Sequence, residues 1–312
     1  MLETAKPFSI ILVPDTQIMT ARHPELLHPM CKWIADQAEA LNVRMVLHLG
    51  DVVNNGASQE SQYQLVADAL DVIHQAGLPM MLAMGNHDYD NEVKQDRSAV
   101  MFNRHFGRFY EQQTWLGGTY EAGAIENSYA RMQLGGSPYV FLVMEFGPRD
   151  EVLAWADRIL QEHADHKAII VTHCFMYING KRSQPGDAHN PKIYPGATGA
   201  NDGEDVWHKL IKKHPRLIGV FSGHQVPVNV SHRTDLGEQG NVVLQAFQNW
   251  QSSERGGEGR LRILTIDPEN STMSLAVFNP SSGNYEHEAG YQVAHSFKEV
   301  TPPFESTVFP TL

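Results

Sequence analysis

The sequence has few of the features that would place a protein in an oxidising compartment or in a membrane. Its 312 residues include only two cysteines, Cys31 and Cys174, too few for a disulfide framework. No apolar run approaches the ~20 residues that a transmembrane helix needs. Residues 1–7 lack a basic segment followed by an apolar stretch of signal-peptide length. We therefore expect a soluble, cytoplasmic protein with no membrane partner.

Basic residues are scarce relative to acidic ones. The chain has 24 Lys and Arg against 36 Asp and Glu, which gives a net charge of −12. A nucleic-acid-binding surface usually carries a basic footprint, so we expect no nucleic-acid partner. With 42% hydrophobic and 19% charged residues, the composition is otherwise that of an ordinary globular protein.

The first part of the chain contains a repeated unit of strand, polar loop and helix. Apolar runs of strand length alternate with segments whose apolar residues recur at helical spacing. Strands are expected at 8–13, 43–49, 80–84, 139–145, 168–172 and 217–222, and helices at 24–41, 60–76, 150–163 and 204–214. This alternation predicts parallel strands joined by right-handed crossovers.

The pattern changes after residue 225. Four more strands, with no helix between them, are expected at 226–230, 242–247, 261–266 and 273–278. They predict a second, largely antiparallel sheet that packs on the first. The predicted fold class is therefore α/β, an α+β sandwich of two packed mixed sheets flanked by helices.

Two segments interrupt this order inside one expected domain, 1–297, which an extended tail follows at 298–312. Segment 90–138 mixes basic and aromatic residues and is expected as a helical excursion, whereas 174–205 is a loop rich in Gly, Pro, Asn and Asp. Both follow strand ends, so we expect them to form walls over a binding site. Most of their basic residues are expected in solvent, with contact to an anionic substrate as the alternative; they include Arg97, Arg104, Arg108, Lys181, Arg182, His189 and Lys192.

Residues that can bind metal ions follow five of the expected strands. They are Asp15 and Gln17, then Asp51, then Asn86 and His87, then His173, and finally His224. One polar residue after a strand is usually a cap or a turn, but the carboxyl ends of parallel strands share one edge of a sheet. Mixed carboxylate, amide and imidazole donors suit Mn, Fe or Zn. Two such ions ~3.5–4 Å apart can clamp a phosphoryl group, with Asp51 shared between them.

In their order, these motifs resemble those of the calcineurin-like metallophosphoesterases: Asp-x-His, Gly-Asp, Gly-Asn-His-Asp/Glu, a lone His, and Gly-His-x-His. The resemblance extends over residues 8–278, and it implies a β-sandwich flanked by helices. It implies that one metal ion is held by Asp51, Asn86, His173 and His224, and the other by Asp15, with Asp51 bridging. It also implies that His87 acts as a catalytic acid outside the ligand shell, oriented by Asp88.

Two departures fall on the same metal site. Gln17 and Val226 stand where the family has histidines, although the Asp-Thr-Gln form resembles that of one branch of the family. Gln17 still offers an amide oxygen, whereas Val226 offers no donor; His23, His28 and His232 are possible substitutes. We expect one tightly bound transition-metal ion and a second, weaker one.

These residues predict metal-dependent hydrolysis of phosphomonoester or phosphodiester bonds in a small phosphorylated substrate by a metal-activated hydroxide. The alternative is a non-catalytic protein that binds metal or a phospho-ligand and has a degraded second metal site. Gln17 and Val226 favour this alternative. The complete run Gly85-Asn86-His87-Asp88 favours the enzyme, because a binding protein has less need of a positioned acid.

Overall fold

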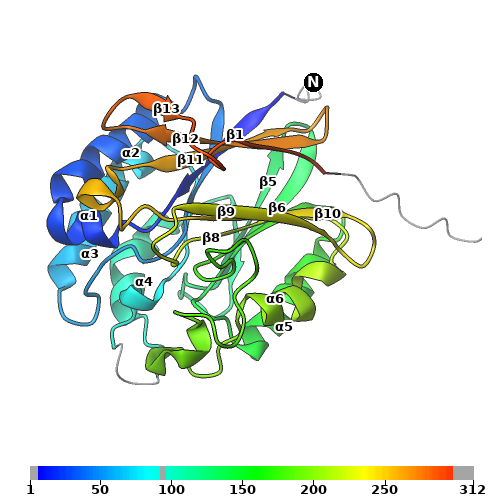
Figure 1. Cartoon of the computed structure of the whole chain (residues 1–312), viewed down its shortest axis with the longest axis horizontal. Coiled ribbons are helices and arrows are strands. Elements are labelled where there is room, and N and C mark those ends of the chain that lie inside the picture. Colours follow the sequence, from blue (N-terminus) through cyan, green and yellow to red (C-terminus); the bar gives the residue numbers. More distant parts are fainter. Residues whose placement is uncertain (1–5, 92–95, 298–312) are drawn as a thin grey trace, which may run out of the picture.

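Two mixed β-sheets pack face to face between two groups of helices (Figure 1). The computed structural model describes residues 6–91 and 96–297. The strands are β1 Phe8–Val13, β2 Val43–His48, β3 Met80–Leu82, β4 Leu116–Thr119, β5 Ser128–Leu134, β6 Ser137–Met144, β7 Lys167–Thr172, β8 Leu217–Ser222, β9 Val230–Leu236, β10 Val242–Gln248, β11 Leu261–Asp267, β12 Thr272–Asn279, β13 Asn284–Glu286 and β14 Val293–Ser296. The α-helices are α1 Gln17–Arg22, α2 Leu27–Asp36, α3 Glu60–Gln75, α4 Val100–Phe106, α5 Asp150–Glu162 and α6 Gly203–Lys209.

The first sheet combines strands from the two ends of the chain, whereas the second sheet consists of strands from its middle. The first has the order β13-β12-β11-β1-β2-β3, with β14 paired to β12, and the second has the order β4-β5-β6-β7-β8-β10-β9. Strands β1, β2 and β3 are parallel, as are β6, β7, β8 and β10. The predicted fold class of two mixed sheets flanked by helices is thus confirmed.

The predicted composition of the second sheet is wrong. The last strands do not form a sheet of their own, because β11 pairs antiparallel with β1 and β10 pairs parallel with β8. Apolar periodicity identifies a strand but not its partner, and β1 and β8 would otherwise leave main-chain groups unpaired at a sheet edge. The strand expected at 226–230 also begins later, as β9 at Val230.

Segment 90–138 is also only partly helical. Its α-helical part is α4, and its second half forms β4 and β5, which extend the second sheet beyond β6. The two glycines inside β4, Gly117 and Gly118, lower the strand signal in the sequence. The short helix α1, which begins two residues after Asp15, was also not predicted. The predicted domain limits stay a prediction, and the tail at 298–312 lies outside the described residues.

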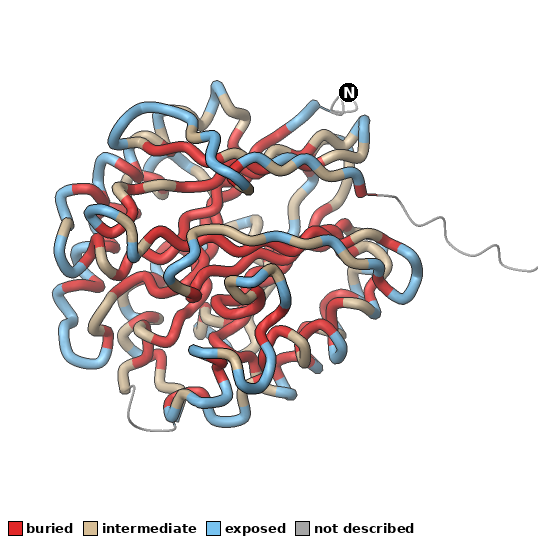
Figure 2. The backbone as a smooth tube through the Cα atoms, viewed as in Figure 1, coloured by how far each residue is buried: buried red, intermediate tan, exposed pale blue. Residues whose placement is uncertain are grey.

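The core follows the alternation of side chains along the strands. In β6, Tyr139, Phe141 and Val143 belong to the core cluster that contains the residues of β1 and β2, whereas Val140 and Leu142 pack with α5 and α6. The buried backbone runs through both sheets, and exposed segments are confined to the periphery (Figure 2). This packing sets the ends of β1 and β2 opposite those of β7 and β8. Within residues 6–91 and 96–297, no helix has both the length and the apolar character needed to cross a bilayer.

Candidate metal centre

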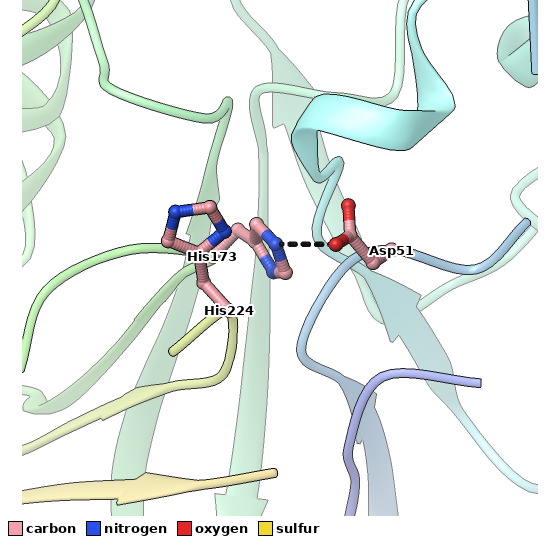
Figure 3. A group of neighbouring side chains, drawn as sticks. All are labelled: Asp51, His173 and His224. Carbon is pink, nitrogen blue, oxygen red and sulfur yellow. Dashed lines mark ion pairs between the residues drawn. The ribbon is translucent and has the colours of Figure 1, made fainter. Parts of the chain in front are cut away.

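Three predicted ligands from the two sheets meet at one point. Asp51 follows β2, whereas His173 follows β7 and His224 follows β8. One donor atom of each lies within 4.8 Å of the others, and all three residues are buried. Figure 3 shows Asp51 facing His173, whose Nε2 lies 3.1 Å from Asp51 Oδ2. The fold therefore builds a cluster with one carboxylate and two imidazoles across the sheet interface.

Two further predicted ligands border this cluster. The main-chain N–H of His224 donates to both carboxylate oxygens of Asp15, at 3.1 and 3.2 Å. The carboxylate of Asp15 also approaches His173, with Oδ1 3.7 Å from Nε2. On the other side, the N–H of His87 donates to Asp51 Oδ1 at 3.0 Å, which holds the preceding residue, Asn86, beside Asp51. The five residues Asp15, Asp51, Asn86, His173 and His224 are thus gathered at one site.

The hydrogen bonds of these residues leave donor atoms available for a cation. His173 Nδ1 lies 2.8 Å from the carbonyl of Leu49, and His224 Nε2 lies 2.7 Å from the carbonyl of His189. Because a carbonyl accepts, each of these nitrogens carries the proton of the neutral ring, and in that form the other nitrogen keeps its lone pair. Asn86 Oδ1 is buried without a hydrogen-bond partner among the described residues, and the neighbour of His173 Nε2 is the Asp51 carboxylate, an acceptor. Buried polar atoms are rarely left in this way, so the residues present fit a metal ion.

The main chain around the ligands is specialised for close approach. A Cβ atom at Gly223 would lie 2.3 Å from Asp15 Oδ2, and one at Gly85 would lie 2.2 Å from Asp51 Oδ1. Asp51 and His224 both have positive φ, 49° and 76°, a conformation that costs free energy for non-glycine residues and is found mainly at functional sites. The glycines of the Gly-Asp, Gly-Asn and Gly-His motifs therefore create the space that the ligands occupy.

The electrostatics of the cluster favour a positive charge between two carboxylates. Burial raises the pKa of Asp15 to about 7; the charge of Asp51 adds to this rise and His173 opposes it. Burial would lower the pKa of His173, but Asp51 and Asp15 outweigh it and raise that pKa to about 9. Burial would raise the pKa of Asp51, yet the neighbouring His173 and His87 keep it below its usual range. Without a bound cation, the His173 imidazolium supplies that charge.

The two departures from the family motifs also lie at this centre. The amide nitrogen of Gln17 donates to Asp51 Oδ2 at 3.1 Å and to Gln251 Oε1, so in this arrangement it is a partner of Asp51. Val226 lines the adjoining pocket, while His23, His28 and His232 are absent from the described residues that line it. None of these three histidines therefore borders Val226 in the pocket lining, and the weaker second metal site stays a prediction.

His87 and Asp88 have different surroundings. His87 lines the pocket, and its Nδ1 lies 2.7 Å from the carbonyl of Asn54. Asp88 is buried, and its carboxylate accepts the N–H groups of Val53 and Gly85 at 3.0 and 2.8 Å. The carbonyl of Asn54 thus contacts the His87 ring, and the orientation of His87 by Asp88 stays a prediction. The observed role of Asp88 is to fix the loops that carry the ligands.

A pocket of about 360 Å³ opens beside the cluster. It is lined by Gln17, Asp51, Asn86, His87, Tyr89, His189, Tyr194, Pro195, Gly196, His224, Val226 and Gln251. Tyr89, Tyr194 and Gln251 were not predicted as pocket residues. The long loop was expected near the site, but no local pattern shows which of its residues turn inward. Gln251 follows β10, which was assigned to the wrong sheet.

Most of the basic residues that were considered for contact with substrate form ion pairs with carboxylates of the protein itself. Arg97 pairs with the buried Glu145 at 3.0 Å. Similar ion pairs join Arg104 to Glu60 at 3.4 Å, Arg108 to Asp71 at 2.8 Å, Arg182 to Asp235 at 2.7 Å and Lys192 to Asp202 at 3.0 Å. Of the candidates in the long loop, His189 is the one that lines the pocket. Carboxylates of the protein itself thus neutralise most of these cations.

This combination of two packed sheets and a buried cluster of Asp, Asn and His is that of a metallophosphatase fold. Residues 8–228 match the family described as calcineurin-like phosphoesterase, and the chain belongs to this family. The predicted resemblance is thereby confirmed.

Known structures and relatives agree with this assignment. The dimetal phosphatase of Danio rerio matches with a TM-score of 0.59 and 12% identity, over 93% of this chain and 99% of that chain. Purple acid phosphatase PPD1 from yellow lupin seeds matches with a TM-score of 0.55 and 15% identity, over 95% of this chain and 55% of that one. The uncharacterized protein YvnB of Bacillus subtilis is 26% identical over 280 residues, 88% of this chain. The matched region covers 20% of the length of YvnB, so the chain spans about a fifth of that relative.

Proposed function

We propose that the protein is a metal-dependent phosphoesterase that acts on a small phosphorylated substrate. The observation that carries this proposal is the buried group of Asp51, His173 and His224, with Asn86 Oδ1 left without a hydrogen-bond partner among the described residues. Membership of the calcineurin-like phosphoesterase family supports it. So does the fold shared with two phosphatases. Mn, Fe or Zn are the ions that suit this donor set.

Asp51, Asn86, His173 and His224 would hold one ion, and Asp15 would hold the second together with Asp51. Bound divalent ions supply Lewis acidity toward phosphoryl oxygens and lower the pKa of water. Asp51 can serve both ions because its two carboxylate oxygens face different neighbours, His87 N–H and His173.

His87 is the residue that we assign to proton transfer. Its ring borders the pocket, and the carbonyl of Asn54 accepts the Nδ1 proton. This hydrogen bond restrains the ring, and in the imidazolium form Nε2 would carry the proton that the departing alcohol oxygen needs. General acid catalysis of this kind contributes about 10²–10⁴-fold to the rate.

The proposal is tested by measuring metal content and turnover on the same preparation. Protein purified without chelator should contain a transition metal by mass spectrometry and should hydrolyse 4-nitrophenyl phosphate or bis(4-nitrophenyl) phosphate. His173→Ala should lose both metal and activity, whereas His208→Ala, an exposed histidine on α6, should lose neither. Metal-loaded protein that hydrolyses neither ester would overturn the proposal and favour the non-catalytic binding protein.

A further inference from the structure

We infer that the pocket selects phosphodiesters, which carry one negative charge, over phosphomonoesters, and that it holds the second ester group against an aromatic wall centred on Tyr194. This inference rests on the proposed function and names its substrate class. Three observations carry it: the charge of the pocket lining, the position of the aromatic wall, and the size of the pocket.

The first observation is the charge of the lining. Among the described residues, the pocket wall contains no lysine and no arginine, and its carboxylate is that of Asp51. The nearby basic side chains are held by the protein's own carboxylates, as Arg97 is by Glu145. A monoester is largely a dianion at neutral pH, because its second pKa is about 6. It therefore brings one more negative charge than a diester into a lining whose described residues include imidazoles but neither lysine nor arginine.

The second observation is an apolar wall beside the proposed metal ligand His224. It consists of Tyr89, Tyr194, Pro195 and Val226. The ring of Tyr194 stands edge-on to His224, with centroids 5.7 Å apart, so the wall begins beside a metal ligand. Val226 adds apolar surface where the family has a histidine. A group attached to a phosphorus atom at the centre would therefore contact this wall directly.

The third observation is the size of the pocket, together with the contacts that hold its aromatic wall in place. Tyr194 packs against Phe146 with centroids 5.2 Å apart, and Phe146 packs against His224 at 5.0 Å. The hydroxyl of Tyr194 also lies 3.2 Å from His189 Nδ1. The pocket of about 360 Å³ lies within the usual size for small-molecule sites, and a phosphoryl group fills only part of it. A preformed aromatic surface of this kind stabilises an apolar or aromatic ester group at little entropic cost.

The test compares the two esters on metal-loaded protein. The kcat/KM for bis(4-nitrophenyl) phosphate should exceed that for 4-nitrophenyl phosphate by roughly tenfold or more, since an unpaired like charge is strongly unfavourable. Tyr194→Ala should lower kcat/KM for the diester by about 3- to 10-fold, the range of one aromatic contact, and should change that for the monoester much less. Tyr194→Phe keeps the ring and should keep the ratio, and Tyr285→Ala, on the exposed edge strand β13, is the matched control.

A second pair of variants tests the charge argument independently of the wall. Gln251→Lys adds a cation to the lining and should raise the monoester-to-diester ratio of kcat/KM, whereas the neutral Gln251→Met should not. A wild-type preference for the monoester, or an equal loss of both activities in Tyr194→Ala at unchanged metal content, would overturn this inference while leaving the proposed function in place. Turnover of neither ester would overturn both.

Discussion

His87 is the pocket residue whose contribution is most easily separated from metal binding. Its main-chain N–H supports Asp51, and this contact survives any change of the side chain. His87→Ala should therefore lower kcat by about 10²–10⁴-fold while the metal content stays near that of the wild type. His173→Ala, which removes a ligand, is the comparison that should lose both. If metal loss in His87→Ala matched the loss of activity, His87 would be a ligand and its assigned role would be wrong.

Val226 determines, in our interpretation, how unequal the two metal sites are. It borders the pocket beside His224, where it provides no donor, and Gln17 is engaged with Asp51 and Gln251. Even the loss of a residue that only supports a ligand costs about 10–100-fold in affinity. The wild type should therefore bind one ion tightly and a second only at high concentration.

Val226→His should restore tight binding of the second ion, which titration calorimetry with Mn²⁺ would measure, and Val226→Ala should not. Phosphate in the buffer should raise the occupancy of the weak site in the wild type by bridging both ions. Two ions bound equally tightly by the wild type would contradict this prediction. The substitute ligand would then be sought first at Gln17.

At the scale of elements, the long loop 174–205 contributes to the metal centre itself. The carbonyl of His189 accepts the Nε2 proton of His224 at 2.7 Å, which leaves Nδ1 as the nitrogen that would bind a metal ion. The loop is held at both ends by buried residues, since Arg182 pairs with Asp235 and Asp202 caps α6. The loop was predicted as a wall over the site. In addition, its His189 carbonyl forms a hydrogen bond with the proposed ligand His224.

Replacing residues 186–198 by a short Gly-Ser link should therefore weaken metal binding by about 10–100-fold and also change the preference among esters. The buried anchors on both sides remain, so circular dichroism should show a folded protein. A Gly-Ser replacement of Glu238 and Gln239, in the turn between β9 and β10, is the control and should change neither property. Unchanged metal affinity in the shortened protein would show that the His189 carbonyl does not position His224.

The sequence predicts the elements well where a local pattern carries the information. Apolar runs that end in a glycine and a polar residue identified β2, β3 and β8 with their ligands Asp51, Asn86 and His224. The sheet to which each strand belongs was not predicted for β10 and β11, because the pairing partner of a strand depends on the tertiary fold and not on its local sequence. The residues of the pocket wall were not predicted either, because nothing in the local sequence distinguishes Tyr194 from the other aromatic residues of the loops.

For the whole molecule, the candidate metal centre lies at the junction between the two sheets. Asp15, Asp51 and Asn86 extend from the first sheet, and His173 and His224 extend from the second. Between them, direct contacts are few and polar, such as the 3.1 Å approach of His173 to Asp51. A bound ion would connect both sheets at the edge where their strands end. Because the ligand set exists only in the folded chain, an ion that binds it stabilises the native state.

Removal of the metal should therefore lower the thermal stability of the entire domain. A free ion concentration of about 100 times Kd stabilises by about 2.7 kcal/mol. With an unfolding entropy of about 2.1 cal/mol/K per residue, 1 kcal/mol shifts Tm by roughly 1–2 °C in a chain of 312 residues. Dialysis against chelator should thus lower Tm by roughly 3–5 °C in differential scanning calorimetry, and added Mn²⁺ should restore it. In His173→Ala, Tm should respond far less to either treatment. A Tm of the wild type that is the same with and without metal would mean that the ion does not join the sheets, and that the buried cluster is stable through the His173 imidazolium alone.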